Sequence, residues 1–135
     1  MRRRDFTTSA LVGMAAAAAL PAASKAEDSA DSDQNVLFSG SDVGHWGSAV
    51  AAKHVPLVTV TAGTVSIKTP HPQHETHYIV SHTVVLADGK FLSRKTFSYK
   101  DAPVSEHPLP AGYTGKVTIT STCNLHDIWK KTVTV

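Results

Sequence analysis

The feature that most restricts the fold of this chain is a series of short segments in which apolar and polar residues alternate. A period of two residues places the apolar side chains on one face of a β-strand. The predicted strands cover residues 57–61, 64–68, 78–86, 91–99, 115–121 and 129–135. From residue 27 onward, no segment has a sustained helical periodicity. The pattern therefore predicts an all-β antiparallel sandwich of six or seven short strands.

Turn signals between these segments support the same architecture. Asp88-Gly89 lies between two alternating segments, and this pair favours a tight hairpin because both residues tolerate positive φ. The Pro-rich stretch at residues 101–112 predicts a connection without a strand. One face of each strand is expected to form the core, with Val58, Val60, Val65, Ile67, Val84, Leu86, Val117, Ile119, Val133 and Val135.

The first 26 residues predict an export signal rather than a part of the fold. Three arginines, Arg2 to Arg4, precede an apolar stretch at residues 10–20, and small residues follow up to Ala26. The apolar stretch is shorter than the about 20 residues that span a bilayer, so a membrane anchor or an alanine-rich domain helix is the weaker interpretation. Paired arginines indicate the twin-arginine route. We therefore expect a periplasmic protein, cleaved near Ala26, with no membrane span after cleavage.

The domain boundaries follow from this signal. We expect a twin-arginine signal peptide at residues 1–26, a flexible lead-in at residues 27–42 and one β-sandwich domain at residues 43–135. Cleavage removes four of the 13 basic residues and one of the 11 acidic ones, which leaves a net charge of −1. The remaining lysines are scattered and form no basic stripe, so we expect no nucleic-acid partner.

The only cysteine of the chain, Cys123, is three residues before His126. A lone cysteine cannot form an internal disulfide, so it pairs between chains, stays free or binds something. The Cys-x-x-His spacing lets both side chains reach one ion, and His54, His71 and His77 also lie at strand ends or in loops. Thiolate and neutral imidazole together suit iron, copper and zinc better than magnesium or calcium. These residues therefore predict a transition-metal site at one rim of the sandwich.

The remaining histidines have an ordinary structural interpretation. They are His45, His74, His82 and His107. His45 is a minor candidate for supporting the site, because Trp46 follows it.

Three motifs, taken together and in this order, resemble the iron domain of the superoxide reductase family, which includes desulfoferrodoxin and neelaredoxin. They are Lys53-His54-Val55-Pro56, His71-Pro72-x4-His77-Tyr78-Ile79 and Cys123-Asn124-x-His126. The likeness covers roughly residues 45–135. It implies an immunoglobulin-like β-sandwich that holds one mononuclear iron, cycling between Fe2+ and Fe3+.

The resemblance also implies a ligand set and a reaction. The equatorial ligands would be His54, His71, His77 and His126, and the axial ligand would be Cys123. The sixth position would stay open for superoxide, which is reduced by one electron to hydrogen peroxide, and an external donor protein would then reduce the iron again. Lys53 would attract superoxide and stabilise the developing negative charge.

Two positions depart from the family pattern. Ala52 stands where the family often has a glutamate that fills the sixth position of the oxidised iron, so the oxidised ligand is left open. Asp127 stands where the family usually has glycine, and it would either lower the local positive potential or orient His126. A single cysteine also excludes the four-cysteine iron centre that some members carry.

Two other functions remain in competition with the enzyme. One is a non-enzymatic metal-binding domain on the same fold. The other is a blue-copper-like electron-transfer protein, which usually needs a weak axial methionine. The only methionines, Met1 and Met14, lie in the predicted signal. The sequence leaves open the electron donor, the reduction potential and whether the protein forms a homo-oligomer.

Overall fold

A computed structural model of the chain describes residues 36–135. The predicted signal peptide and the first part of the predicted lead-in, residues 27–35, lie outside the described residues. The elements are β1 (Leu37–Ser39), the 3-10 helix η2 (Gly44–Trp46), α2 (Ser48–His54), β2 (Leu57–Thr61), β3 (Thr64–Lys68), β4 (Ile79–Leu86), β5 (Phe91–Thr96), β6 (Val104–Pro108), β7 (Lys116–Cys123) and β8 (Ile128–Thr134). Within this part of the chain, no helix is long and apolar enough to cross a bilayer.

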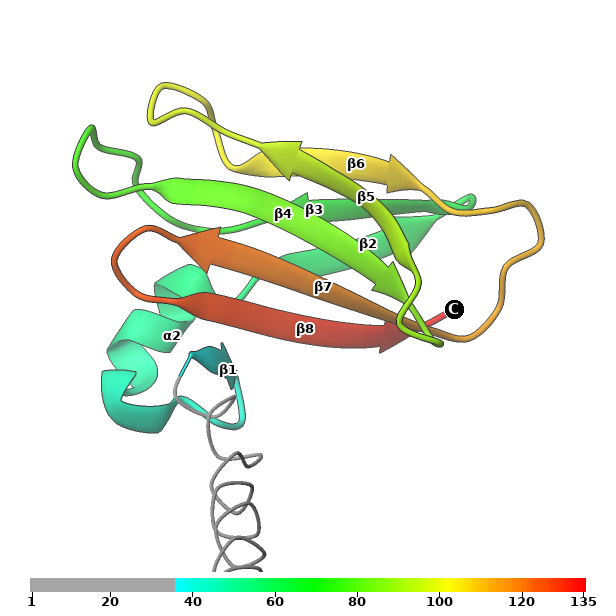
Figure 1. The fold of residues 1–135 in the computed structure, drawn as a ribbon, viewed down its shortest axis with the longest axis horizontal. Coiled ribbons are helices and arrows are strands. Elements are labelled where there is room, and N and C mark those ends of the chain that lie inside the picture. Colours follow the sequence, from blue (N-terminus) through cyan, green and yellow to red (C-terminus); the bar gives the residue numbers. More distant parts are fainter. Residues whose placement is uncertain (1–35) are drawn as a thin grey trace, which may run out of the picture. The chain divides into compact units, whose positions relative to one another are not determined.

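The strands form two sheets, as Figure 1 shows. The larger sheet has the strand order β1-β8-β7-β4-β5, and the smaller sheet has the order β2-β3-β6. All pairs are antiparallel except β1 with β8, which is parallel. The predicted all-β sandwich is therefore confirmed, with eight strands in the described residues.

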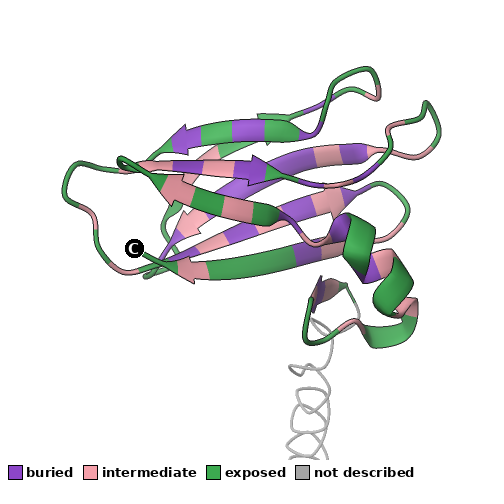
Figure 2. Cartoon of the chain, turned by 180° about the vertical axis from the view of Figure 1, so that it is seen from behind, coloured by how far each residue is buried: buried purple, intermediate pink, exposed green. Residues whose placement is uncertain are grey.

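The core lies between the sheets and comes from the faces that the alternation predicted. Its fully buried members are Val65, Ile67, Val84, Leu86, Val117 and Ile119, and half-buried Val58, Val60 and Val133 pack against them. Burial of each such side chain contributes about 1.5–3 kcal/mol. Buried positions alternate with exposed ones along β6 and with half-buried ones along most of β7 (Figure 2). Val135 was wrongly assigned to the core, because it lies beyond the end of β8 and is 36% exposed.

Strand β6 corrects the prediction that the Pro-rich connection contains no strand. It alternates as a strand should, but the residues that it buries, Ser105 and His107, are polar. The alternation of hydrophobic residues therefore gave no signal there. Pro108 is tolerated because it ends the strand at the edge of the smaller sheet.

The short helix α2 was not predicted from the sequence, which has no sustained helical periodicity from residue 27 onward. Its seven residues form two turns, too few for a helical period to repeat, although three alanines favour the helix. It buries Ala51 and His54, which are three residues apart and so share one face. The helix thereby places His54 at the rim of the sandwich.

Strand β1 lies inside the segment that was expected to be a flexible lead-in. Phe38 in this strand is 1% exposed, and its ring centroid lies 5.4 Å from that of Trp129. Pairing with β8 and this aromatic contact make residues 37–39 part of the domain. The expectation of a lead-in therefore differs from the structure at these residues.

Candidate metal centre

The predicted ligands converge at the rim where α2 ends and the loops before β4 and after β7 lie (Figure 1). One ligand atom from each of His54, His77, Cys123 and His126 lies within 4.8 Å of the other three. His71 adjoins them, with its Nε2 atom 3.1 Å from Nε2 of His77. The structure thus brings one sulfur and four imidazoles to one place.

His54 presents an unprotonated nitrogen to this cluster. Its Nδ1 atom lies 2.7 Å from the carbonyl oxygen of Val50, which can only accept, so Nδ1 carries the hydrogen. Nε2 therefore has a free lone pair. This atom is buried and has no hydrogen-bond partner among residues 36–135. An unsatisfied buried polar atom costs about 1–3 kcal/mol, which a metal ion at this position would offset.

Gln73 orients the ring of His71 in the way that a backbone carbonyl orients the ring of His54, with the hydrogen on Nδ1. The Gln73 side-chain oxygen accepts the backbone N–H of Ile79 at 2.8 Å, which fixes the orientation of the amide group. The same oxygen lies 3.3 Å from Nδ1 of His71, so that nitrogen is the donor. Nε2 of His71 is then unprotonated, and its lone pair faces His77. Sequence reasoning missed Gln73, whose only signal is its position between two predicted ligands.

In the centre, the ring nitrogens of His71, His77 and His126 face one another instead of oxygen acceptors. Nε2 of His77 lies 3.1 Å from Nε2 of His71 and 2.9 Å from Nδ1 of His126. A hydrogen on His77 satisfies at most one of these two contacts, whereas a cation accepts every lone pair at once. The donor set therefore fits a transition-metal ion.

Burial favours the neutral form of His54, His71 and His77, which is the form that binds a metal. It lowers the pKa of His54 to about 4, against the opposing hydrogen bond to Val50 and with smaller contributions from the neighbouring histidines. It also lowers the pKa of His71 and of His77. The pKa of Cys123 is raised, mainly by burial, although the backbone N–H groups of Leu125 and His126 oppose this effect. Binding of a cation would favour the thiolate and release its proton.

Asn124 ties the two ligand-bearing loops together. Its side-chain oxygen accepts the backbone N–H of Tyr78 at 2.9 Å, and its side-chain nitrogen donates to the carbonyl of Thr76 at 3.1 Å. These bonds join the loop of His77 to the turn that follows Cys123. The rigid link reduces the entropy lost when a metal orders the ligands.

The other predicted positions lie outside the cluster. Lys53 and Ala52, the two residues before His54 in α2, are exposed. His74 is exposed, and its backbone pairs with that of His77. His45 is also exposed and packs against Trp46, with ring centroids 4.5 Å apart.

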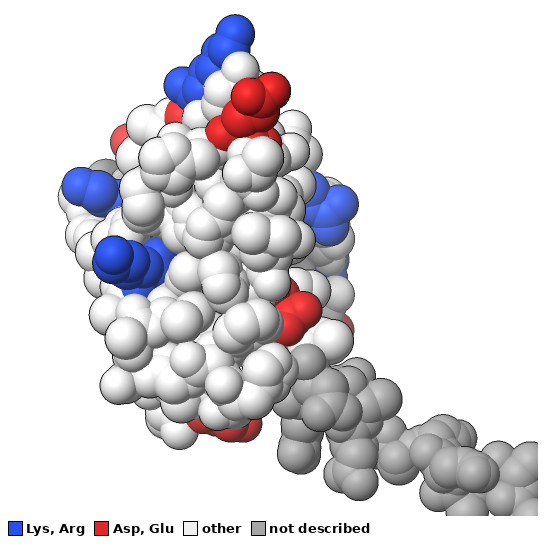
Figure 3. Space-filling view, turned by 90° about the vertical axis from the view of Figure 1, so that its left-hand side faces the viewer, with Lys and Arg blue, Asp and Glu red and all other residues white. Residues whose placement is uncertain are grey.

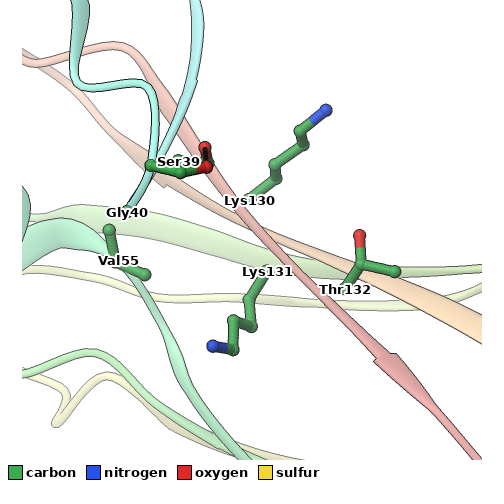
Figure 4. Close-up of a pocket in the computed structure, with 7 residues that line it drawn as sticks. Ser39, Gly40, Val55, Lys130, Lys131 and Thr132 are labelled. Atoms are coloured by element: carbon green, nitrogen blue, oxygen red, sulfur yellow. Dashed lines mark hydrogen bonds between the residues drawn. The ribbon is translucent and has the colours of Figure 1, made fainter.

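A separate pocket lies beside β1 and β8 and does not belong to the centre. It is lined by Ser39, Gly40, Ser41, Val55, Lys130, Lys131 and Thr132. The side chains of Lys130 and Lys131 extend in opposite directions, because neighbouring residues of a strand face opposite sides (Figure 4). No pair of cations converges on a ligand there.

The fold and the donor set define the class: a small β-sandwich protein with a histidine and thiolate metal centre in its rim loops. A family model described as Desulfoferrodoxin matches residues 47–132, and the chain belongs to this family. The predicted family is therefore confirmed. A comparison with curated protein sequences gives no significant match.

Several solved structures share the fold. The superoxide reductase (neelaredoxin) from Ignicoccus hospitalis is 21% identical, with a TM-score of 0.63 over 75% of this chain and 94% of that one. The superoxide reductase (1Fe-SOR) from Giardia intestinalis is 23% identical, with a TM-score of 0.56 over 62% of this chain and 98% of that one. A mutant of the superoxide reductase (neelaredoxin) from Archaeoglobus fulgidus, in the reduced form, is 25% identical, with a TM-score of 0.54 over 62% of this chain and 89% of that one.

Proposed function

We propose that this protein is a mononuclear non-haem iron superoxide reductase, which converts superoxide to hydrogen peroxide. The observation that carries this proposal is the buried Nε2 atom of His54, which has no hydrogen-bond partner in the described part of the chain and lies beside the other predicted ligands. Membership of the Desulfoferrodoxin family and the likeness to structures titled superoxide reductase support it.

The proposed iron ligands are His54, His71, His77, Cys123 and His126. When bound, the iron supplies one electron to superoxide and takes one back from an external donor protein. Each superoxide consumes one electron and two protons and yields one hydrogen peroxide. Cys123 contributes the charge of its thiolate, and the backbone N–H of Leu125, 3.5 Å from Sγ, partly balances that charge.

Lys53 is the proposed residue for attracting the substrate. The middle of the face that carries the ligand loops shows uncharged side chains, and the charged ones lie mostly toward its margins (Figure 3). A cation next to His54 in the chain would therefore contribute strongly to the field at the centre. Substitution Lys53→Ala should slow superoxide capture about tenfold at low salt and less at high salt. Lys131→Ala, on the exposed surface of β8, is the control. An unchanged capture rate in Lys53→Ala would remove this residue from the mechanism.

We also propose that the chain reaches the periplasm by the twin-arginine route, on the strength of its N-terminal arginines and apolar stretch. Expression of a fusion to a reporter protein should give export that depends on Arg3 and Arg4, the arginine pair of the motif Arg3-Arg4-Asp5-Phe6. Export of the form with both arginines replaced by lysine would contradict this route.

The test of the enzymatic function is metal analysis followed by rapid mixing with superoxide. We expect one iron per chain, a thiolate-to-iron charge-transfer band in the ferric form and rapid oxidation of the ferrous form by superoxide. Substitution His77→Ala should abolish iron binding, whereas His74→Ala, in the same loop but exposed, should retain it. Ferrous iron that superoxide leaves unchanged would favour a non-enzymatic metal-binding domain, and an intense blue copper band would favour electron transfer.

A further inference from the structure

Asp127 adopts a backbone conformation that side chains rarely occupy. Its φ is 66°, in the left-handed region that glycine occupies most readily and that Asp and Asn tolerate better than other side chains. The turn requires this conformation, because the Asp127 carbonyl accepts the backbone N–H of Cys123 at 2.9 Å and closes the loop between the two ligands Cys123 and His126. Glycine would fit here with less strain, so the aspartate side chain invites a functional explanation.

The carboxylate of Asp127 does not contact His126 but reaches across to Trp46. Nε1 of Trp46 donates to Oδ2 of Asp127 at 3.1 Å, although the two residues are 81 positions apart. This bond connects η2 with the turn between β7 and β8. The orientation of the indole ring therefore depends on the residue that follows His126.

The edge contact between Trp46 and His126 transmits this orientation to the ligand. The two ring centroids are 4.7 Å apart, and the ring planes meet at 76°. Nδ1 of His126 faces the centre, 2.9 Å from Nε2 of His77 and 3.7 Å from Sγ of Cys123. The other ring nitrogen of His126 has no hydrogen-bond partner among residues 36–135.

His126 thus differs from two of its neighbours in the centre. A carbonyl oxygen fixes the ring of His54, and an amide oxygen fixes the ring of His71. The carbonyl of His126 accepts Nε1 of Trp129 at 2.8 Å, which holds its backbone but not its ring. The rings of His54 and His77 also pack against this imidazole, but both are predicted ligands themselves, and Trp46 packs against it from outside the ligand set.

We propose that Asp127 is a positioning residue that acts through Trp46 to hold the His126 imidazole with Nδ1 toward the metal. The proposal rests on the ligand set of the proposed function. It explains why this chain tolerates an aspartate at a left-handed position next to a ligand: the side chain makes the bond that glycine cannot make.

The test uses cobalt(II) as the probe and requires no superoxide. The readouts are the thiolate-to-cobalt absorption band and the rate at which a chelator removes the metal. Asp127→Gly should shift the band and speed dissociation about tenfold, in the range typical for partners that orient a ligand. Trp46→Phe keeps an aromatic ring without the N–H donor and should have the same effect. The double variant should dissociate no faster than either single variant, because both remove one contact.

Two further variants separate the contact from other causes. Asp127→Asn keeps an oxygen acceptor without the charge and should stay within about threefold of the wild type. Ala62→Gly removes comparable backbone strain, since Ala62 has a φ of 50° in the turn between β2 and β3, and should leave dissociation unchanged.

Wild-type dissociation in Asp127→Gly would overturn the proposal, as would an Asn variant as fast as the glycine variant or additive effects in the double variant. Failure of cobalt to bind at all would remove both proposals. The expected cobalt results, together with ferrous iron that is inert to superoxide, would remove only the enzymatic function.

Discussion

The domain contains two groups of buried or half-buried histidines, one at the rim and one between the sheets, and the partners of their ring nitrogens distinguish them. At the rim, His71, His77 and His126 face one another, and His54 has a buried nitrogen without a partner among the described residues. Between the sheets, every ring nitrogen of His82 and His107 meets a hydroxyl group. The rim nitrogens have lone pairs that a cation could bind, whereas the ring nitrogens of the inner group are all hydrogen-bonded.

The inner group is a continuous hydrogen-bonded chain across the sandwich. His82 contacts Thr69 and Ser105, each at 2.8 Å. His107 contacts Ser105 at 2.9 Å and Ser93 at 2.6 Å. A hydroxyl can both donate and accept, so it complements whichever tautomer the neighbouring ring adopts.

The comparison also teaches that a lowered pKa does not identify a ligand. Burial lowers the pKa of both His54 and His82 to about 4, and the two residues are 3% and 0% exposed. His54 and His82 are therefore both buried histidines that favour the neutral form. What separates them is whether the neighbouring atoms are hydroxyl oxygens or other nitrogens.

The largest expected effect comes from truncating one histidine of each group. His54→Ala should weaken metal binding by more than roughly 100-fold, because it removes a ligand rather than an outer partner. His82→Leu should leave metal binding within about threefold but lower the free energy of unfolding by about 2–4 kcal/mol, because Thr69 and Ser105 lose a buried partner. Chelator competition and urea denaturation of the metal-free protein measure the two quantities. If the two variants changed metal binding and the free energy of unfolding to the same extent, the distinction between the two groups of histidines would be wrong.

The next largest effect is expected in the pH dependence of stability, through the buried His82 of the inner group. The pKa of His82 is about 4 in the folded protein, mainly through burial, and 6.5 in its ordinary state. Between these values the unfolded chain binds a proton that the folded protein does not. The contribution of His82 to the free energy of unfolding should therefore be fully present above pH 6.5. The free energy of unfolding should fall by roughly 3 kcal/mol as the pH drops to 4.

Urea titrations of the metal-free wild type and of His82→Leu measure this difference, since the rim histidines contribute equally to both. A wild type and variant with parallel pH profiles would show that His82 is not the group responsible.

A smaller effect is expected at the rim when only the orientation of a ligand is lost. Gln73→Leu removes the acceptor of the His71 Nδ1 hydrogen and should speed metal dissociation about tenfold. Gln73→Glu retains an acceptor at the same place and should restore most of the wild-type rate. Identical rates in the leucine variant and the wild type would mean that the ring of His71 is held by something else.

The smallest effect is expected at the outer end of the inner chain. Ser93→Ala removes the half-buried hydroxyl that contacts Nδ1 of His107 and should lower the free energy of unfolding by about 1 kcal/mol. Metal dissociation should not change. A faster dissociation in this variant would indicate that the two groups are coupled.

Much of the fold followed from the alternation of residues, and the failures have definite causes. Strand β6 was not predicted because the residues that it turns inward are polar: Ser105 contacts His82, and His107 contacts Ser105. Helix α2 was not predicted because its seven residues are too few for the 3.6-residue period of hydrophobic residues to repeat. Long-range pairing with β8, which no local pattern reveals, makes β1 part of the sheet.

The sequence by itself determined the architecture and the candidate ligands, because alternation sets strand faces and because short motifs place thiol and imidazole at strand ends. Only the tertiary structure decided which histidines face each other and which face hydroxyl groups. It also decided that the carboxylate of Asp127 meets Trp46 rather than His126. These contacts join residues up to 81 positions apart, and their geometry depends on how the two sheets and the helix pack together.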